Sequence, residues 1–220
     1  MREYIDKMSR SKLFKNIKKE DIPVLTDCLG AVVKKYKKGE YIIRWGEKVR
    51  AVYMVAEGCV HIVKTDHWGN ESIMARSVEG AVFAEAYACL ENVSAGVDAV
   101  AAEDTVVIEM NINSIITTCP SACKFHSVLI RNLIAVIAEK NAALNDKVEC
   151  VCQRSTRDKI RSYLSLEAEK RESNVFDIPF NRQQMADYLA VERSALSKEL
   201  SKMRAEGIIA YNKNHFEILE

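Results

Sequence analysis

The 220-residue sequence lacks the features that mark membrane and exported proteins. No apolar run reaches the roughly 18–20 residues that a membrane-spanning helix needs. The first residues, 1–6, contain no apolar core of the signal-peptide type. Low-complexity tracts and internal repeats are also missing, and 48% of the residues are hydrophobic. We therefore expect a globular, cytoplasmic protein without a membrane partner.

Recognisable catalytic and metal-binding patterns are missing as well. The four histidines form no HxH pair, and no Ser/His/Asp or Cys/His arrangement can be placed: His61, His67, His126 and His215. A metal-dependent β-roll enzyme of the cupin type needs His and carboxylate ligands clustered on its strands. We expect no enzyme activity, no catalytic residue, no metal and no cofactor, and the cupin-type enzyme stays as an alternative.

The seven cysteines include no CxxC motif. The only close pairs are Cys119 with Cys123 and Cys150 with Cys152, both on sequence that we predict to be helical. Reduced thiols that act as small buried hydrophobic side chains are the favoured interpretation. A metal or iron–sulfur site, or a redox switch, remains as an alternative.

Charge is spread unevenly although the net charge is only +1. Residues 1–50 carry 14 Lys/Arg and 7 Asp/Glu, whereas residues 51–110 carry 2 and 10. Residues 153–220 carry 12 and 11. Binding of nucleic acid by the C-terminal part would therefore depend on individually placed charges and not on a bulk basic field.

Hydrophobic periodicity divides the chain into three parts. Residues 1–29 look helical, with a helix start at residues 20–23. Short strands separated by glycine follow, which predicts an antiparallel roll or barrel: 31–36, 41–44, 52–56, 59–64, 72–78, 97–101 and 105–110. The small-residue stretch 84–96 interrupts them as a short helix and loop. From residue 121 the period is helical again.

Within residues 121–152, apolar residues recur at spacings of four and three over three heptads. This seam has one polar position, Asn141, and predicts a dimerising coiled coil: Ile130, Ile134, Ile137, Asn141, Leu144 and Val148. An ordinary amphipathic core helix is the alternative. Residues 152–156 are a plausible hinge into a second domain.

The C-terminal part has the pattern of a helix-turn-helix with a wing. Asn181 followed by Gln184 is the chemistry of a capping box. A short helix, a tight link at Ala190 and a second helix over 192–204 follow, and then a hairpin of 208–211 and 215–219. Four polar residues would lie outward near the start of the second helix, as reading of the major groove requires: Arg193, Ser194, Ser197 and Lys198.

The whole chain resembles the Crp/Fnr family of bacterial transcription regulators. The segments that carry the resemblance are 36–40, 45–47, 52–58 and 182–203. The resemblance implies an α+β fold of three parts: a jelly-roll-like double-stranded β-roll that senses an effector (1–120), a long dimerisation helix with a hinge (121–152), and a winged helix-turn-helix (153–220). It implies a homodimeric, sequence-specific transcription regulator that binds a pseudo-palindromic operator, with RNA polymerase as a further candidate partner.

The resemblance also assigns residues in the DNA-binding part. Arg193 matches the base-reading Arg of the family, and Arg182, beside Gln183, matches a residue that approaches the DNA backbone or neighbouring bases. Lys198 stands where many members have Arg, whose planar fork Lys lacks. Ala190 replaces the usual glycine of the turn, which would cost roughly 1 kcal/mol if its φ is positive.

The effector cassette departs from the cyclic-nucleotide-binding members of the family. Those members open it with Gly-Glu and close it with Arg-Ser, whereas here Ala84-Glu85 opens it and Ala95-Gly96 closes it. Residues 77–105 contain no Lys or Arg, and burial of a phosphate without a cation is costly. We therefore expect an unknown small effector that is not a cyclic nucleotide, with Leu144 and Asn145 as further contacts. Glu85 is either a ligand of that effector or a structural acceptor, and a nucleotide-regulated subunit without a DNA role stays as an alternative.

Overall fold

A computed structural model describes residues 1–69, 71–90, 92–117 and 124–219. The chain forms two compact units, Met1–Ala138 and Glu139–Glu220. Each unit has its own hydrophobic core. Among the described residues, none of the helices combines the length and the apolar character needed to cross a bilayer.

The N-terminal segment is helical only in pieces. Its α-helices are α1 (Ile5–Arg10) and α2 (Ile22–Cys28), separated by short 3-10 turns. The break arises because Ser11 and Lys18 have extended backbone and Asn16 has a positive φ of 64°. Pro23 lies in the first turn of α2, where its missing N–H costs nothing. The expected helix start at residues 20–23 is therefore correct, and the helical segment 1–29 consists of short helices separated by these breaks.

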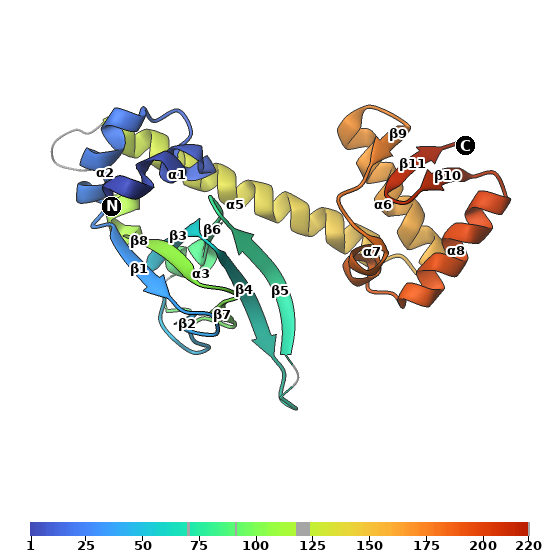
Figure 1. The fold of residues 1–220 in the computed structure, drawn as a ribbon, viewed down its shortest axis with the longest axis horizontal. Helices are drawn as coiled ribbons and strands as arrows, with labels where there is room; N and C mark the ends of the chain where they lie inside the picture. Colours follow the sequence, from blue (N-terminus) through green and yellow to red (C-terminus); the bar gives the residue numbers. More distant parts are fainter. Residues whose placement is uncertain (70, 91, 118–123, 220) are drawn as a thin grey trace. The chain divides into compact units, whose positions relative to one another are not determined.

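Eight strands build the expected roll from two antiparallel four-stranded sheets (Figure 1). The first sheet has the order β1-β8-β3-β6 and the second β2-β7-β4-β5. The bounds are β1 Val32–Tyr36, β2 Tyr41–Ile43, β3 Ala51–Glu57, β4 Cys59–Thr65, β5 Glu71–Val78, β6 Val82–Phe83, β7 Asp98–Ala101 and β8 Thr105–Asn111. The sequence pattern missed β6, because two residues are too short to show an alternation.

Three helices follow or interrupt the strands: α3 (Glu85–Cys89), α4 (Ile112–Ile116) and α5 (Lys124–Val151). The long helix α5 buries Leu129, Leu133 and Val136 in the core of the roll. Asn132, on the same buried side, donates from its amide nitrogen to the carbonyls of Leu13 (2.9 Å) and Lys15 (2.7 Å). The N-terminal segment is thereby fixed to α5.

The second unit is the expected winged helix-turn-helix fold. Its helices are α6 (Thr156–Arg171), α7 (Arg182–Leu189) and α8 (Arg193–Ala205). Its sheet has the order β10-β11-β9, with bounds β9 Val175–Asp177, β10 Ile209–Asn212 and β11 His215–Ile218. The wing is therefore three-stranded, because β9 pairs with β11 across 38–42 residues of chain.

Residues 152–155 are not helical and separate α5 from α6. The Ser155 hydroxyl caps α6 by accepting from the backbone N–H of Asp158 (3.1 Å) and donating to its carboxylate (2.6 Å). Within the second unit, the end of α5 is held to α6 through Lys170 and Asp146, 2.8 Å apart, and through the buried Cys150 beside Ser162.

Candidate nucleic-acid interface and effector cassette

The first helix of the helix-turn-helix, α7, begins with the predicted capping box. Asn181 Oδ1 accepts from the Gln184 backbone N–H, and Gln184 Oε1 accepts from the Asn181 backbone N–H, both at 2.9 Å. The helix ends at Ala190, whose φ and ψ of 50° and 58° are left-handed. Lys159 of α6 donates to the carbonyl of Ala190 (3.4 Å) and to that of Leu189 (3.3 Å). The φ of Ala190 is therefore positive, and alanine carries the strain that glycine would avoid at this turn.

The second helix, α8, has one apolar and one polar face. Leu196, Leu200 and Met203 are completely buried in the core of the unit. On the other side, Arg193, Ser194 and Lys198 are exposed, and Ser197 is half-buried. The spacing of 3.6 residues per turn therefore brings four of the predicted DNA-contacting residues together near the start of one exposed face.

Arg182 and Gln183 lie at the start of α7, and each has a partner in the folded unit. The Arg182 guanidinium lies 4.9 Å from the ring centre of Tyr211 and 5.1 Å from that of Phe216. Burial lowers the pKa of Arg182 below its usual range, and the side chain stays half-buried. Gln183 is exposed and donates to Asp187 at 2.8 Å. Arg182 therefore joins α7 to the wing.

A hollow of about 490 Å³ lies beside Arg182. Its lining combines two cationic and three amide side chains with apolar ones: Pro179, Phe180, Asn181, Arg182, Gln184, Lys213 and Asn214. Lys213, at the turn of the wing, has a φ of 54°, and Asn214 donates to the carbonyl of Ile178 at 3.2 Å. The first turn of α7 and the tip of the wing thus border one hollow.

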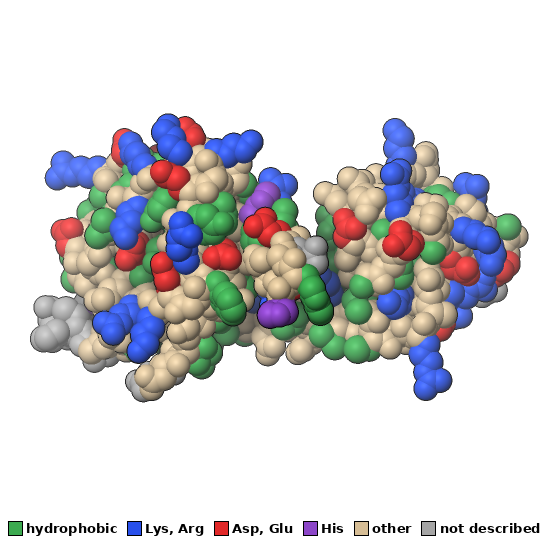
Figure 2. All heavy atoms as spheres, turned by 90° about the horizontal axis from the view of Figure 1, so that it is seen from below, with side chains coloured by type: hydrophobic (Ala, Val, Ile, Leu, Met, Phe, Trp, Pro, Cys, Tyr) green, Lys and Arg blue, Asp and Glu red, His purple; other side chains and the backbone are tan. Residues whose placement is uncertain are grey.

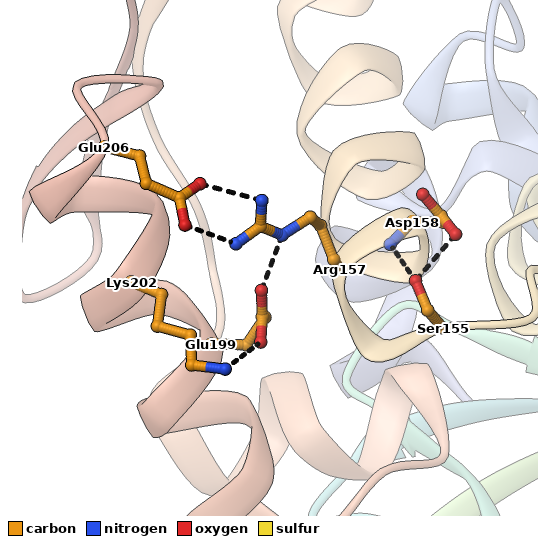
Figure 3. Close-up of polar contacts among 6 residues, drawn as sticks. All are labelled: Ser155, Arg157, Asp158, Glu199, Lys202 and Glu206. Atoms are coloured by element: carbon orange, nitrogen blue, oxygen red, sulfur yellow. Dashed lines mark hydrogen bonds and ion pairs between the residues drawn. The ribbon is translucent and has the colours of Figure 1, made fainter.

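A four-residue charged network, which no sequence pattern predicted, joins α6 to α8 (Figure 3). Arg157 Nε donates to Glu199 at 2.6 Å, while Nη1 and Nη2 donate to Glu206 at 2.7 and 2.9 Å. Lys202 lies 3.8 Å from the second oxygen of Glu199. Hydrogen bonds from Arg157 lower the pKa of Glu206. The partners are 42 and 49 residues apart in sequence, beyond the reach of any local pattern.

The surface of the molecule has no single field of basic charge on the face drawn in Figure 2, where Lys and Arg side chains alternate with Asp and Glu on both units. This distribution agrees with the near-balance of 12 basic and 11 acidic residues in 153–220. Any contact between residues 153–220 and DNA would therefore depend on particular side chains.

In the roll, the residues of the effector cassette are closely packed. Glu85, the first residue of α3, is 6% exposed and follows Ala84, whose φ is 64°. Ala95 is 1% exposed, and its N–H and C=O bond to Glu47 and Gly46, both at 2.8 Å.

Tyr87 of α3 lies against the other end of the cassette. A Cβ atom at Gly96 would come within 3.3 Å of the Tyr87 hydroxyl. Glycine at this position thus makes room for the tyrosine hydroxyl.

The predicted seam on α5 differs from the face that the roll buries. In the single chain the exposed fractions are 61% for Ile134, 59% for Leu144 and 51% for Val148. Ile130 and Ile137 are half-buried, and Asn141 and Asn145 are exposed. Leu144 and Asn145 belong to the second unit, whereas Glu85, Ala95 and Gly96 belong to the first.

The cysteines that the structure describes do not form a cluster. Cys59 and Cys150 are buried, Cys28, Cys89 and Cys152 are exposed, and none of these five forms a disulfide. Burial raises the pKa of the Cys150 thiol. Cys119 and Cys123 lie outside the described residues. In the described part of the chain, His, Cys, Asp and Glu form no group of three that could hold a metal ion.

Comparison with family models gives two matches. A cyclic nucleotide-binding domain model matches residues 33–119, and a Crp-like helix-turn-helix domain model matches residues 158–220. The transcriptional activator protein FnrL of Cereibacter sphaeroides is 36% identical over an alignment of 67 positions, with a coverage of 26% of this chain and 27% of FnrL. The match thus spans about a quarter of the length of that relative.

Solved structures share the fold over almost the whole chain. CprK in complex with OCPA has a TM-score of 0.65 at 16% identity, covering 91% of this chain and 90% of CprK. The regulator CLP of Xanthomonas campestris, titled as responsive to c-di-GMP, has a TM-score of 0.57 at 14% identity, covering 90% and 98%. The catabolite activator protein of Thermus thermophilus has a TM-score of 0.52 at 21% identity, covering 94% and 93%.

Proposed function

Because this chain belongs to the Crp/Fnr family of DNA-binding transcription regulators, we propose that it is a homodimer that reads a pseudo-palindromic operator under the control of a small effector other than a cyclic nucleotide. The observation that carries the proposal is the polar face of α8. Arg193, Ser194 and Lys198 are exposed there, on a helix whose opposite face is completely buried. Such a helix can enter the major groove without disturbing the core of its unit.

The dimer is supported by the apolar residues that the single chain leaves exposed on α5. Ile134, Leu144 and Val148 repeat with heptad spacing, and Asn141 interrupts them once. Burial of each large aliphatic side chain against a second copy would contribute about 1.5–3 kcal/mol. A two-fold dimer places two recognition helices on half-sites about one helical turn apart.

The effector class is inferred from the cassette in the roll. A cyclic phosphate needs a cation, and the segment 77–105 carries none. Ala95 is buried and Tyr87 fills the space beside Gly96. A neutral or apolar small molecule is the ligand class that this environment accepts, and Glu85 would then bind a hydroxyl or amino group of that ligand.

Selection from a pool of random DNA duplexes tests the proposed reading of DNA. The wild-type protein should enrich a pseudo-palindromic duplex. Substitution R193A should weaken binding of that duplex by roughly 1–3 kcal/mol and relax the preference at one base position. Fluorescence anisotropy measures the affinity, and repeated selection measures the base preference.

R204A is the matched control, because Arg204 is an exposed basic residue at the other end of α8, 5.0 Å from the Tyr211 ring. It removes the same charge from the same helix and should leave the base preference unchanged. An unchanged preference in R193A would contradict the assignment of α8 as the recognition helix. Calorimetric titration with cyclic AMP and cyclic GMP tests the effector class, and saturable binding of either would contradict it.

A further inference from the structure

The start of α6 is joined to α8 by a complete set of directed hydrogen bonds from one side chain. Arg157 lies in the first turn of α6, and all three nitrogens of its guanidinium donate to acids on α8 (Figure 3). Glu199 lies in the middle of α8, and Glu206 is its C-cap residue. One side chain thus holds the recognition helix at two points about two turns apart.

The environment of the network favours a well-defined geometry. The side chains of Arg157 and Glu199 are 32% and 17% exposed, and that of Glu206 is 45% exposed. Isolated ion pairs at the surface contribute little, but a bidentate arginine pair within a network has directional bonds. Ser155 and Asp158 cap the same turn of α6, so the backbone that carries Arg157 is fixed as well.

The apolar contacts of α8 do not define its orientation to the same degree. Leu196, Leu200 and Met203 bury its inner face, but hydrophobic contact has no preferred direction. A helix held only in this way can rotate or slide by small amounts. Hydrogen bonds to Glu199 and Glu206 fix both the rotation and the axial position, and therefore the direction in which Arg193 and Lys198 point.

Arg157 is also the last step of a continuous path from α5 to α8 within the second unit. The end of α5 is held to α6 by Asp146 with Lys170 and by the buried Cys150. The fork of Arg157 then joins the first turn of α6 to α8. We propose that Arg157 is a positioning residue that sets the orientation of the recognition helix and passes displacements of the α5–α6 connection to it; this inference depends on the proposed reading of DNA by α8.

The test compares R157K with a matched control, R161K, one turn further along α6 at an exposed position. R157K keeps the charge and loses the planar fork. The probes are the duplex selected by the wild-type protein and a scrambled duplex of equal length. We expect R157K to bind the selected duplex about tenfold more weakly and the scrambled duplex equally well, and R161K to resemble the wild type with both.

The double variant E199Q/E206Q removes the partners and leaves Arg157 in place. It should lose the same ratio of specific to nonspecific affinity, and R157K added to it should cause no further loss, because both changes break one network. A salt series separates a positioning role from direct contact with DNA, and a smaller slope in R157K would overturn the inference. The slope of log affinity against log salt should stay unchanged in R157K, since Arg157 is not expected to contact a phosphate.

The outcomes separate this inference from the proposed function. If the wild type selects no duplex, the reading of DNA is wrong and the inference falls with it. If the wild type selects a duplex and R157K keeps the ratio of the two affinities, only the inference is wrong. Equal losses with both duplexes would also overturn it, because a role in fold stability alone would reduce both, and a melting temperature identifies that case.

Discussion

The two units of this protein differ in how many of the site residues implied by the family resemblance they contain. In the DNA-binding unit, the capping box, the left-handed turn and the exposed polar residues of α8 are all present. In the roll, both sheets and the acidic Glu85 are present, whereas Ala95 and Gly96 stand where a cyclic-nucleotide site needs cation and hydroxyl donors. The fold is thus retained in both units, whereas the site residues that the family resemblance implies are complete in only one.

The difference arises because a fold and a binding site depend on different numbers of residues. A roll is stabilised by many apolar residues, so the replacement of two polar residues in one loop leaves its core intact. A binding site depends on a few charged groups, so the same replacement changes the ligand class. The following predictions test whether the two units are as independent as this comparison implies.

The largest expected effect is the loss of core packing in one unit at a time. L200A in the DNA-binding unit and L129A in the roll each truncate a completely buried leucine. Each should lower the free energy of unfolding of its own unit by about 2–5 kcal/mol. Differential scanning calorimetry should show two transitions, with only one displaced in each variant. A common displacement of both transitions would show that the units unfold together.

The next largest effect is expected on the dimer, through α5, which contributes residues to both units. L144K places a charge on the proposed dimer seam, and each copy should lose about 1.5–3 kcal/mol of apolar burial. Sedimentation should detect dissociation into monomers with little change in the monomer's stability, because Leu144 is 59% exposed in the single chain. A142K is the control, two residues away and also exposed. Dissociation by both variants, or by neither, would place the interface elsewhere.

A smaller effect is expected at the alanines with left-handed backbone, of which each unit has one. A84G and A190G should each raise the free energy of unfolding by about 0.5–1 kcal/mol, because positive φ strains alanine more than glycine. The control A135G, in the exposed and regular part of α5, should lower it by about 0.5–1 kcal/mol. Urea unfolding measures all three. If A84G alone is destabilising, the cassette in the roll needs the stiffness of alanine.

The smallest effect is the pH dependence of exposed ion pairs in the two units. Hydrogen bonds from Arg157 lower the pKa of Glu206, and a hydrogen bond from Lys37 lowers that of Asp104. A lowered folded-state pKa stabilises the protein above the ordinary carboxyl value of about 4 and loses this effect as pH falls through the lowered value. E206Q and D104N should therefore be less stable than the wild type at pH 7, and this difference should be smaller at about pH 3. Urea midpoints at the two pH values check this, and an undiminished difference at low pH would contradict it.

Local signals in the sequence predicted much of both units. Seven of the eight strands of the roll begin and end within one residue of their expected bounds, because glycine and turn residues separate these short runs in the sequence itself. Asn181 and Gln184 form their capping box across three residues, and Ala190 has the expected positive φ. The helical character of residues 1–29 was predicted, but the breaks within it were not, since Ser11 and Lys18 adopt extended backbone that the apolar spacing does not reveal.

The sequence alone therefore determined the order of the elements, the helix-turn-helix and the missing cation of the cassette, since each depends on residues close together in the chain. Only the tertiary structure decided which apolar face of α5 is buried, because Leu129 and Leu133 alternate with Ile130 and Ile134 on one helix. It also decided that β9 joins the wing, that Tyr87 fills the space beside Gly96, and that Arg157 binds Glu199 and Glu206. These contacts join surfaces that form only when separate elements pack, so no periodicity in the sequence reports them.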